Sequence, residues 1–247
     1  MKDTLLFSDV HLKPYVAGDR HHEDFLAFLR WIDPQQVGRL ICVGDLFDFW
    51  FEYRHAVFAS YFEALRLLAG LNRAGVEMHL FRGNHDLWAG PQLERLTGMR
   101  VHKGPACLPF DDREACLLHG DGLNPRDYGY RLFKRIAQNS AVQGIFRHIH
   151  PDTAMGFAQW VSRNSRAMGK AENPADGPEA ETVRAHACHL IGDGRAAIVI
   201  CGHAHVPVIE HIEVRGLRGL YVNPGDWPLH RSYIRYARGE FSQHTFC

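Results

Sequence analysis

Five short apolar runs in this chain each lead into Asp, His or Asn residues. Runs this short and this rich in bulky or β-branched side chains are typical of buried strands. The runs are residues 4–7, 39–43, 77–81, 115–118 and 196–201, and the polar residues that follow them are Asp9 and His11, Asp45, Asn84 and His85, His119, and His203 and His205. This pattern predicts an α/β protein whose chemistry lies where its strands end.

Helical patterns separate the first three runs. One helical face carries Phe25, Phe28, Leu29 and Ile32, and a second carries Phe62, Leu65, Leu68 and Ala69. Strands that alternate with helices predict a largely parallel sheet with helical crossovers. Residues 206–214, 219–222 and 232–237 form short apolar or alternating stretches between Gly and Pro, which predicts further, antiparallel strands.

Residues from about 122 to 187 interrupt this pattern. They hold two amphipathic helical patterns and then a stretch at 171–181 that is rich in Pro, Gly and acidic residues, which predicts a loop. A chain of 247 residues is long enough for one large domain. We therefore expect a single domain over residues 1–247 with a helical cap insertion at about 122–187.

The polar residues after the five runs are of the types that bind divalent cations. The carboxyl ends of parallel strands meet at one sheet edge, where ligands of open α/β sheets bind. Residues two apart on a strand point to the same face, so Asp9 and His11 could reach one cation, as could His203 and His205. About seven candidate ligands are too many for one cation, and Asp45 could bridge two. Two cations about 3.5–4 Å apart can bind phosphate oxygens and activate water.

Each motif alone also fits a plainer interpretation, in which these are turn and capping residues with buried, hydrogen-bonded His. Five motifs in this order, each at the end of an apolar run, favour a metal site instead. Imidazole ligands suit Mn, Fe, Co, Ni or Zn better than Mg. We expect two divalent metal ions, with Mn²⁺ as the first choice and Fe, Zn, Co or Ni as alternatives.

The motifs D-x-H, G-D, G-N-H-D, H-G-D and G-H-x-H follow one another between Asp9 and His205. In this order they resemble those of the calcineurin-like metallophosphoesterases. The resemblance implies hydrolysis of a phosphoester by a four-layer α/β/β/α sandwich with two mixed sheets and a dinuclear centre at one edge. It also implies two ligand sets that share Asp45: Asp9, His11, Asp45 and His205 for one metal, and Asp45, Asn84, His119 and His203 for the other.

His85 and Asp86 have a different role in the same resemblance. It implies that His85 is not a metal ligand but lies beside the leaving group, as proton donor or charge stabiliser. Asp86 is expected to orient His85. Both residues are therefore candidate catalytic residues.

Composition limits the partners and the compartment. Lys plus Arg and Asp plus Glu both number 28, and a chain without basic excess is not expected to bind nucleic acid through general electrostatics. We find no signal peptide and no stretch near the roughly 20 apolar residues that span a bilayer. The six Cys form no C-x-x-C pair, and Cys42 and Cys201 lie inside apolar runs. We expect reduced cysteines in a cytoplasmic protein.

Two features bear on the substrate. Four aromatic residues, Phe47, Phe49, Trp50 and Phe51, follow closely after Asp45. Residues 122–170 hold eight basic and two acidic side chains. Apolar helices with a basic face suit an anionic, amphiphilic substrate at a membrane surface. Ordinary core aromatics and solvated helix faces are the plainer alternatives.

A closer resemblance rests on His119-Gly-Asp-x-Leu, then Asp127, Tyr130 and Phe133, then Asn164-Ser165 and Lys170. These residues resemble the UDP-2,3-diacylglucosamine hydrolase family of lipid A biosynthesis, and the tail at 221–227 resembles a divergent branch of it. That family commonly has Arg at the position of His85. The resemblance implies cleavage of the pyrophosphate to UMP and 2,3-diacylglucosamine 1-phosphate by a protein peripheral to the inner membrane. The substrate contacts that it implies are Asn84, Asp127, Tyr130, Asn164, Ser165, Arg166 and Lys170.

Two alternatives are left open by the sequence. The chain could be a metallophosphoesterase that acts on another nucleotide, a phosphodiester or a phosphoprotein, with the insertion as a cap that holds no lipid. It could also be a non-catalytic scaffold that metal ions stabilise, although His85 argues against this, since a structural site has no need of a group beside the metal.

Overall fold

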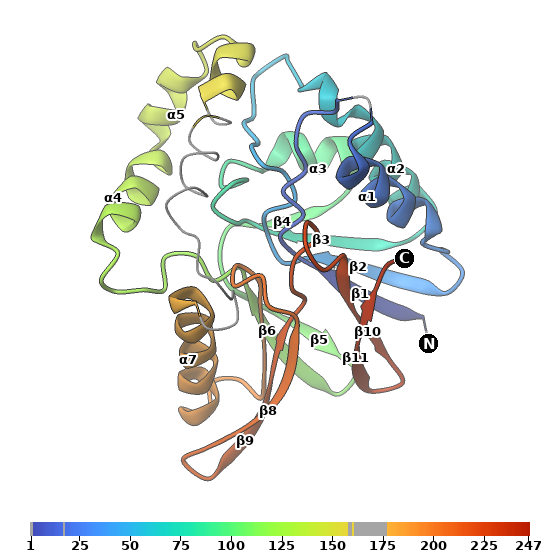
Figure 1. Ribbon diagram of the computed structural model, residues 1–247, viewed down its shortest axis with the longest axis vertical. Helices are drawn as coiled ribbons and strands as arrows, with labels where there is room; N and C mark the ends of the chain where they lie inside the picture. The colour runs from blue at the N-terminus through green and yellow to red at the C-terminus, as the bar shows by residue number, and fades with distance from the viewer. Residues whose placement is uncertain (1, 17, 158–159, 161–176) are drawn as a thin grey trace.

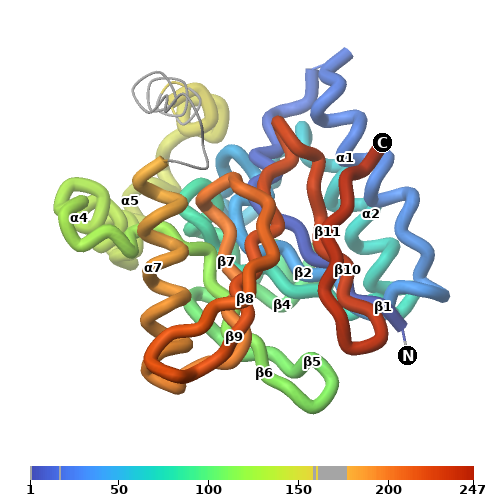
Figure 2. The backbone as a smooth tube through the Cα atoms, turned by 60° about the horizontal axis from the view of Figure 1, so that its bottom comes forward, coloured from blue at the N-terminus to red at the C-terminus, as the bar shows by residue number. Residues whose placement is uncertain are grey.

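Two β-sheets pack face to face and helices cover both outer faces in the computed structural model, which describes residues 2–16, 18–157, 160 and 177–247 (Figure 1). Figure 2 shows α7 on one side of the strands and α1 and α2 on the other. This is the four-layer α/β/β/α sandwich that the family resemblance implies. Its two inner faces meet in an apolar layer that includes Leu6, Ile41, Leu117 and Ile200.

The first sheet has the strand order β11-β10-β1-β2-β3-β4. Its strands are β1 (Asp3–Phe7), β2 (Val37–Cys42), β3 (Glu77–Phe81), β4 (Arg100–His102), β10 (Ser232–Ala237) and β11 (Glu240–Thr245). Strands β1 to β4 are parallel, and β10 pairs with β1 in the antiparallel direction. The expected parallel sheet is thus present, and its helical crossovers are α1 (Arg20–Trp31) and α2 (Phe62–Arg73), the latter preceded by the 3₁₀ turn Ala59–Tyr61.

The second sheet has the order β5-β6-β7-β9-β8. Its strands are β5 (Ala106–Phe110), β6 (Arg113–Leu118), β7 (Ile198–Cys201), β8 (Val208–Val214) and β9 (Leu217–Asn223). Strands β6, β7 and β9 are parallel, whereas β5 and β8 run antiparallel to their neighbours. The five apolar runs therefore belong to two sheets, three to the first and two to the second.

Amphipathic periodicity explains the covering helices. Phe25, Phe28 and Leu29 of α1 are buried against the first sheet, as are Leu65 and Leu68 of α2. The short helix α3 (Pro91–Thr97) covers the same layer. On the other side, α7 (Pro178–Gly192) buries Val183, Ala187 and Ile191 against the second sheet.

The insertion contributes α4 (Tyr128–Ala137), α5 (Ser140–Phe146) and a further helical stretch at residues 151–157. These helices lie beyond the strand ends, away from the outer faces of the sandwich (Figure 1). The first ten of the fifteen residues of α7 fall within the expected range 122–187, yet this helix covers the second sheet. Of the predicted loop, residues 171–176 lie outside the described part of the chain.

The aromatic residues after Asp45 divide between two surroundings. Phe47 and Trp50 are fully buried in the core beneath α1 and α2. Phe49 and Phe51 instead pack against Phe146 of α5, with ring centroids 6.3 and 4.7 Å from it. Part of this segment therefore belongs to the core, and the other part forms an aromatic surface on which the cap packs.

Cysteine chemistry differs from the expectation at one pair. Cys42 and Cys201 are buried thiols, as predicted. Cys107 and Cys116 are direct cross-strand partners of β5 and β6 with Cα atoms 4.1 Å apart, and they form a disulfide. The prediction of reduced cysteines is wrong for this pair, because the register between the two strands was not evident from the sequence. Among the described residues, no helix has the length and hydropathy needed to cross a bilayer.

Candidate metal centre

The loops after β1 and β2 continue to pair beyond the strands. The amide of Asp9 donates to the carbonyl of Gly44 at 3.0 Å, and the amide of His11 donates to the carbonyl of Asp45 at 2.9 Å. The amide of Gly202 after β7 donates in the same way to the carbonyl of His119 after β6. These bonds hold the loops of each sheet side by side and bring the candidate ligands to one edge of the sandwich.

Five of the predicted metal ligands have a left-handed backbone. Asp9, His11, Asp45, His203 and His205 have φ angles from 48° to 65°. Such angles cost energy for residues other than Gly and are concentrated at functional sites. Asp9 and His11 do offer ligand atoms to one group, as expected. Local turns in the left-handed region aim these side chains, in place of the extended i, i+2 alternation that was predicted.

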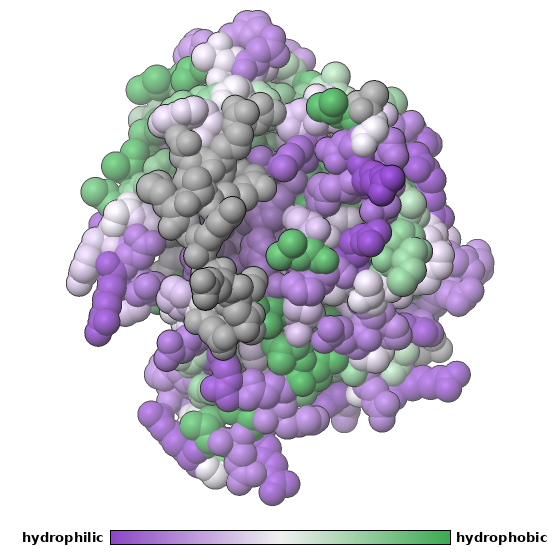
Figure 3. All heavy atoms as spheres, in the orientation of Figure 1, coloured by the Kyte–Doolittle hydropathy of each residue, from purple (hydrophilic) through white to green (hydrophobic). Residues whose placement is uncertain are grey.

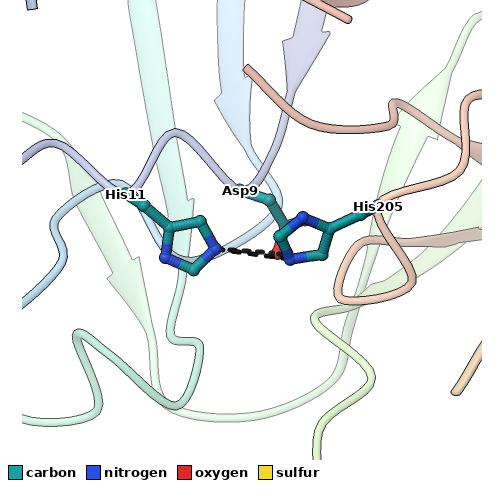
Figure 4. A group of neighbouring side chains, drawn as sticks. All are labelled: Asp9, His11 and His205. Atoms are coloured by element: carbon teal, nitrogen blue, oxygen red, sulfur yellow. Dashed lines mark hydrogen bonds and ion pairs between the residues drawn. The ribbon is translucent and has the colours of Figure 1, made fainter. Parts of the chain in front are cut away.

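The first group of ligand atoms comes from Asp9, His11 and His205, whose side chains point toward one another (Figure 4). His205 Nε2 lies 3.4 Å from both Asp9 Oδ1 and His11 Nε2, and His11 Nε2 lies 3.9 Å from Asp9 Oδ1. Ligand atoms that share one cation at about 2.1 Å lie roughly 3.0–3.4 Å apart in tetrahedral or octahedral arrangements. The group is close to that spacing.

The second group lies around Asp45 and His119. His119 Nε2 is 3.3 Å from Asp45 Oδ2 and 3.4 Å from Asn84 Oδ1, and the His203 ring centroid is 5.1 Å from that of His119. Asp45 Oδ2 also lies 3.9 Å from His11 Nε2 in the first group. Asp45 thus stands between the two groups, and His203 and His205 belong to different groups.

The remaining atoms of these ligands are held by the surrounding chain. Asp9 Oδ2 accepts hydrogen bonds from the Ser8 hydroxyl at 2.5 Å and the His203 amide at 2.9 Å. Within the described residues, Asp9 Oδ1 is buried and has no hydrogen-bond partner. His119 Nδ1 lies 2.8 Å from the carbonyl oxygen of Val43, which leaves Nε2 to bind a cation. This donor set fits a divalent cation.

Glycine at position 83 permits the close approach of two loops. A Cβ atom at Gly83 would lie 2.1 Å from Asp45 Oδ1, well inside van der Waals contact. The residue after next, His85, donates its amide to the same oxygen at 2.9 Å. The Gly83 loop therefore closes over Asp45 only because residue 83 lacks a side chain.

The buried carboxylates and imidazoles of the centre shift one another's pKa. Burial opposes ionisation of Asp45, yet the neighbouring His119 and His85 hold its pKa well below the usual value. Burial also opposes protonation of His119, but Asp45 and Asp9 keep its pKa well above normal. Burial and the nearby His119 lower the pKa of His203 to about 4. His203 is therefore in the neutral form that binds a cation, whereas His119 would have to release its proton on binding one.

His85 is more exposed than two of the histidine ligands, His11 and His119, and less exposed than His205. Its side chain is 23% exposed, compared with 9% for His11 and 1% for His119. Its ring meets that of His11 edge-on at 4.6 Å between centroids, and its Nδ1 lies 2.9 Å from the backbone carbonyl oxygen of Asp48. His85 is thus placed beside the ligands with its Nε2 side available to a substrate.

Asp86 does not take the expected position. Its two carboxylate oxygens accept from the amides of Leu46 and Gly83, both at 2.8 Å. The prediction that Asp86 orients His85 is wrong, because its oxygens are occupied by these two backbone amides and Asp48 supplies the acceptor for the ring. Asp86 instead ties together the loops after β2 and β3.

A cavity of about 250 Å³ adjoins the second ligand group. Its lining includes Asn84, His203, Asp127, Tyr130 and, from α7, Glu179. The expected substrate contacts Asn84, Asp127 and Tyr130 therefore share one cavity. The other expected contacts, Asn164, Ser165, Arg166 and Lys170, lie outside the described residues.

Two residues of the cavity, Asp127 and Tyr130, make side-chain hydrogen bonds to other parts of the protein. Asp127 caps α4 by accepting from the Tyr130 amide at 2.9 Å, and the Tyr130 hydroxyl donates to Asp121. Lys134 also donates to Asp121, at 2.6 Å. Burial opposes ionisation of Asp121, but His119 and Lys134 keep its pKa below the usual value. Asp121 of the H-G-D motif thus joins the first cap helix to the metal centre.

Several residues of the centre were missed by reasoning from sequence. Ser8, Asp48 and Asp226 each contact a candidate ligand or His85, and each lies in or beside a motif that was noted. Asp226 belongs to the tail sequence Asn-Pro-Gly-Asp-Trp, whose unusual composition was the available signal. Their partners are distant in sequence, so only the folded chain identifies their contacts.

Comparison with known proteins agrees with this geometry. The calcineurin-like phosphoesterase family matches residues 3–207. The chain belongs to this family. A UDP-2,3-diacylglucosamine hydrolase of Stenotrophomonas maltophilia is 29% identical over 248 residues, which cover 98% of each chain. One of Porphyromonas gingivalis is 32% identical over 182 residues, which cover 69% of this chain and 66% of that protein.

The fold comparison adds a further relative. The solved structure of a novel archaeal phosphodiesterase has a TM-score of 0.50 with this calcineurin-like phosphoesterase, at 15% identity, with 98% of each chain covered. That likeness supports the fold. Family membership makes the protein a phosphoester hydrolase that depends on divalent metal, and the clustered Asp and His side chains are suited to hold it.

Proposed function

We propose that this phosphoesterase hydrolyses the pyrophosphate of UDP-2,3-diacylglucosamine to UMP and 2,3-diacylglucosamine 1-phosphate. The observation that carries the proposal is an aromatic surface, close to the candidate metal centre, on which the cap packs. Phe49 and Phe51 lie within six residues of Asp45 and pack on Phe146 of the cap, together with Tyr53 and Trp88. Relatives over almost the whole chain carry the same activity in their names.

The residues of the centre divide the chemical tasks. One cation would be held by Asp9, His11, Asp45 and His205, and a second by Asp45, Asn84, His119 and His203. When bound, such cations stabilise charge on phosphate oxygens and activate water. His85, fixed by the Asp48 carbonyl at 2.9 Å, would donate a hydrogen bond to a phosphate oxygen or to the leaving group.

The helices of the cap carry exposed apolar side chains and positively charged arginine side chains. Leu132, Phe133 and Ile136 of α4 are exposed, and Arg131 and Arg135 lie on the same helix. Figure 3 shows hydrophobic atoms along the outer edge of the molecule over α4 and α5. Apolar side chains beside cationic ones suit contact with anionic lipid. We therefore propose that the cap docks on the inner membrane surface, with the substrate drawn from the bilayer.

Release of UMP tests the proposal. The full-length protein is loaded with Mn²⁺ and supplied with UDP-2,3-diacylglucosamine or with UDP-N-acetylglucosamine, which lacks the long acyl chains. Because each buried CH₂ contributes about 0.8 kcal/mol, we expect kcat/KM to be at least roughly 100-fold higher for the diacyl substrate. Equal kcat/KM for the two compounds would reject the acyl-chain assignment.

A second candidate is a phosphoesterase for another nucleotide or phosphodiester. The 250 Å³ cavity favours it, since a cavity of this size suits a small polar group beside Asn84 and His203. Activity on a generic aryl phosphodiester without UMP release from the lipid nucleotide would favour this candidate. Loss of both activities in His85→Ala, with metal content retained, would assign them to the same centre.

A further inference from the structure

The loop between β9 and β10 is firmly attached to the loop that carries His203 and His205. Asn223 is fully buried, and its side-chain amide donates to the carbonyl of Gly202 at 3.0 Å while its oxygen accepts from the Gly225 amide at 2.9 Å. The hydroxyl of buried Ser232 closes the loop by donating to the carbonyl of Pro224 at 2.6 Å. The loop therefore holds a fixed position beside the first ligand group.

Trp227 attaches the same loop to the first sheet. Its side chain is fully buried, and its ring lies 5.4 Å from that of Phe25 and 4.9 Å from that of Phe28 on α1. Its backbone amide donates to the carbonyl of Asp9 at 3.2 Å. The loop thus contacts the backbone of Asp9 as well as the segment before His205.

Asp226, between these anchors, is buried and faces two histidines. Its Oδ2 lies 3.2 Å from His205 Nδ1, and its Oδ1 lies 2.6 Å from His230 Nδ1. An ionised carboxylate only accepts hydrogen bonds, so His205 must donate through Nδ1. In the neutral imidazole, the form that binds a cation, that tautomer leaves the lone pair on His205 Nε2, the atom 3.4 Å from Asp9 Oδ1 and His11 Nε2.

We propose that Asp226 is a positioning residue that fixes the tautomer and ring orientation of His205, so that its Nε2 is presented to a divalent cation together with Asp9 and His11. His230, whose side chain is 40% exposed, completes the arrangement by occupying the second oxygen of Asp226. Carboxylates that accept from metal-bound His act in this way and affect metal affinity by about 10–100-fold when removed. The chain His205–Asp226–His230 extends the first ligand group to the molecular surface.

Asp226→Asn tests the proposal through metal binding. Metal-free full-length protein is titrated with Co²⁺, and the Kd values and visible absorption spectrum are recorded. We expect one Kd to rise by about 10–100-fold with an altered Co²⁺ spectrum, and the other Kd to stay the same. Asp193→Asn is the matched control, because Asp193 Oδ2 lies 3.3 Å from His189 Nε2 at the surface, away from the candidate ligands. It should leave both Kd values unchanged.

Two outcomes would overturn the proposal. Unchanged Kd values and spectrum in Asp226→Asn would show that the carboxylate does not position His205. Weaker binding at both sites together with a lower melting temperature of the metal-free variant would assign Asp226 to the fold. Metal binding is measured without substrate, so the result is independent of the substrate proposed above.

A measurement on the unaltered protein covers the case in which the variant fails to fold. Long-range ¹H–¹⁵N spectra of the zinc-loaded protein report which ring nitrogen of each His carries hydrogen. We expect His205 to be protonated at Nδ1 and His230 at Nδ1 as well. Protonation of His205 at Nε2 would overturn the proposal.

Discussion

Asp45 Oδ2 and His119 Nε2 lie 3.3 Å apart, although the two residues follow strands of different sheets. The centre therefore spans the interface between the two halves of the sandwich. His119→Ala removes a donor whose other nitrogen is fixed by Val43, so we expect metal affinity to fall by at least about tenfold. Metal content after dialysis measures this. His189→Ala, at an exposed site, should retain the metal content of the unaltered protein.

His85→Ala should separate chemistry from metal binding. His85 stands beside His11 and is held by the Asp48 carbonyl, and the residue is not among the predicted ligands. We expect kcat to fall by roughly 10²–10⁴-fold, the usual contribution of a positioned acid or base. Metal content should not change. Retention of full kcat would remove His85 from the mechanism.

Gly83→Ala should disturb the centre without changing any ligand. The new Cβ would meet Asp45 Oδ1 at 2.1 Å, so the loop or the carboxylate has to move. We expect weaker metal binding and lower activity. Gly70→Ala is the matched control, because nothing lies within 4 Å of a Cβ there and the residue is inside α2. Chemical denaturation should show this control to be more stable by about 0.5–1 kcal/mol.

We expect the exposed apolar face of α4 to be required for binding to a membrane surface. Phe133 and Ile136 are 54% and 49% exposed. Replacing both with Ser removes side chains that contribute about 1.5–3 kcal/mol each when buried, so binding to anionic vesicles should fall at least about tenfold. Activity on a soluble phosphodiester should remain. Leu217→Ser, at an exposed site at the start of β9, is expected to bind vesicles like the unaltered protein.

A histidine pair on the first sheet should make stability depend on pH. His79 Nδ1 lies 2.9 Å from His102 Nε2, and burial lowers the pKa of both, that of His102 to about 4. Between about pH 6.5 and 4 the unfolded chain binds more protons at these sites than the folded chain. The free energy of unfolding that depends on these two neutral rings is therefore greatest above pH 6.5, and it decreases as the pH falls toward 4.

His102→Gln removes one member of the pair and gives the measurement. The free energy of unfolding is compared between this variant and the unaltered protein from pH 7 to 4.5. We expect the difference between them to shrink as the pH falls. A constant difference over that range would mean that the pair makes no pH-dependent contribution.

Local pattern was sufficient for eight of the eleven strands in the described part of the chain, for the helices α1 and α2, and for the identity of the candidate ligands. Residues 77–81 were expected as a strand and form β3, because a short apolar run between turns has few other stable arrangements. The short strands β4, β5 and β11 were not expected. Strand β4 has three residues, β5 contains Pro109 and β11 is mostly exposed, so pairing with neighbouring strands determines them.

By itself the sequence determined that strand ends would carry Asp, His and Asn, since the chemistry of a site depends on residue type. Only the tertiary structure decided how these groups meet: that Asp48 holds His85 while Asp86 joins two loops, and that Asp226 faces His205. Such contacts depend on left-handed turns, on the packing of two sheets and on hydrogen bonds between residues far apart in the chain. No local pattern records these relations, because they arise from the packing of the whole domain.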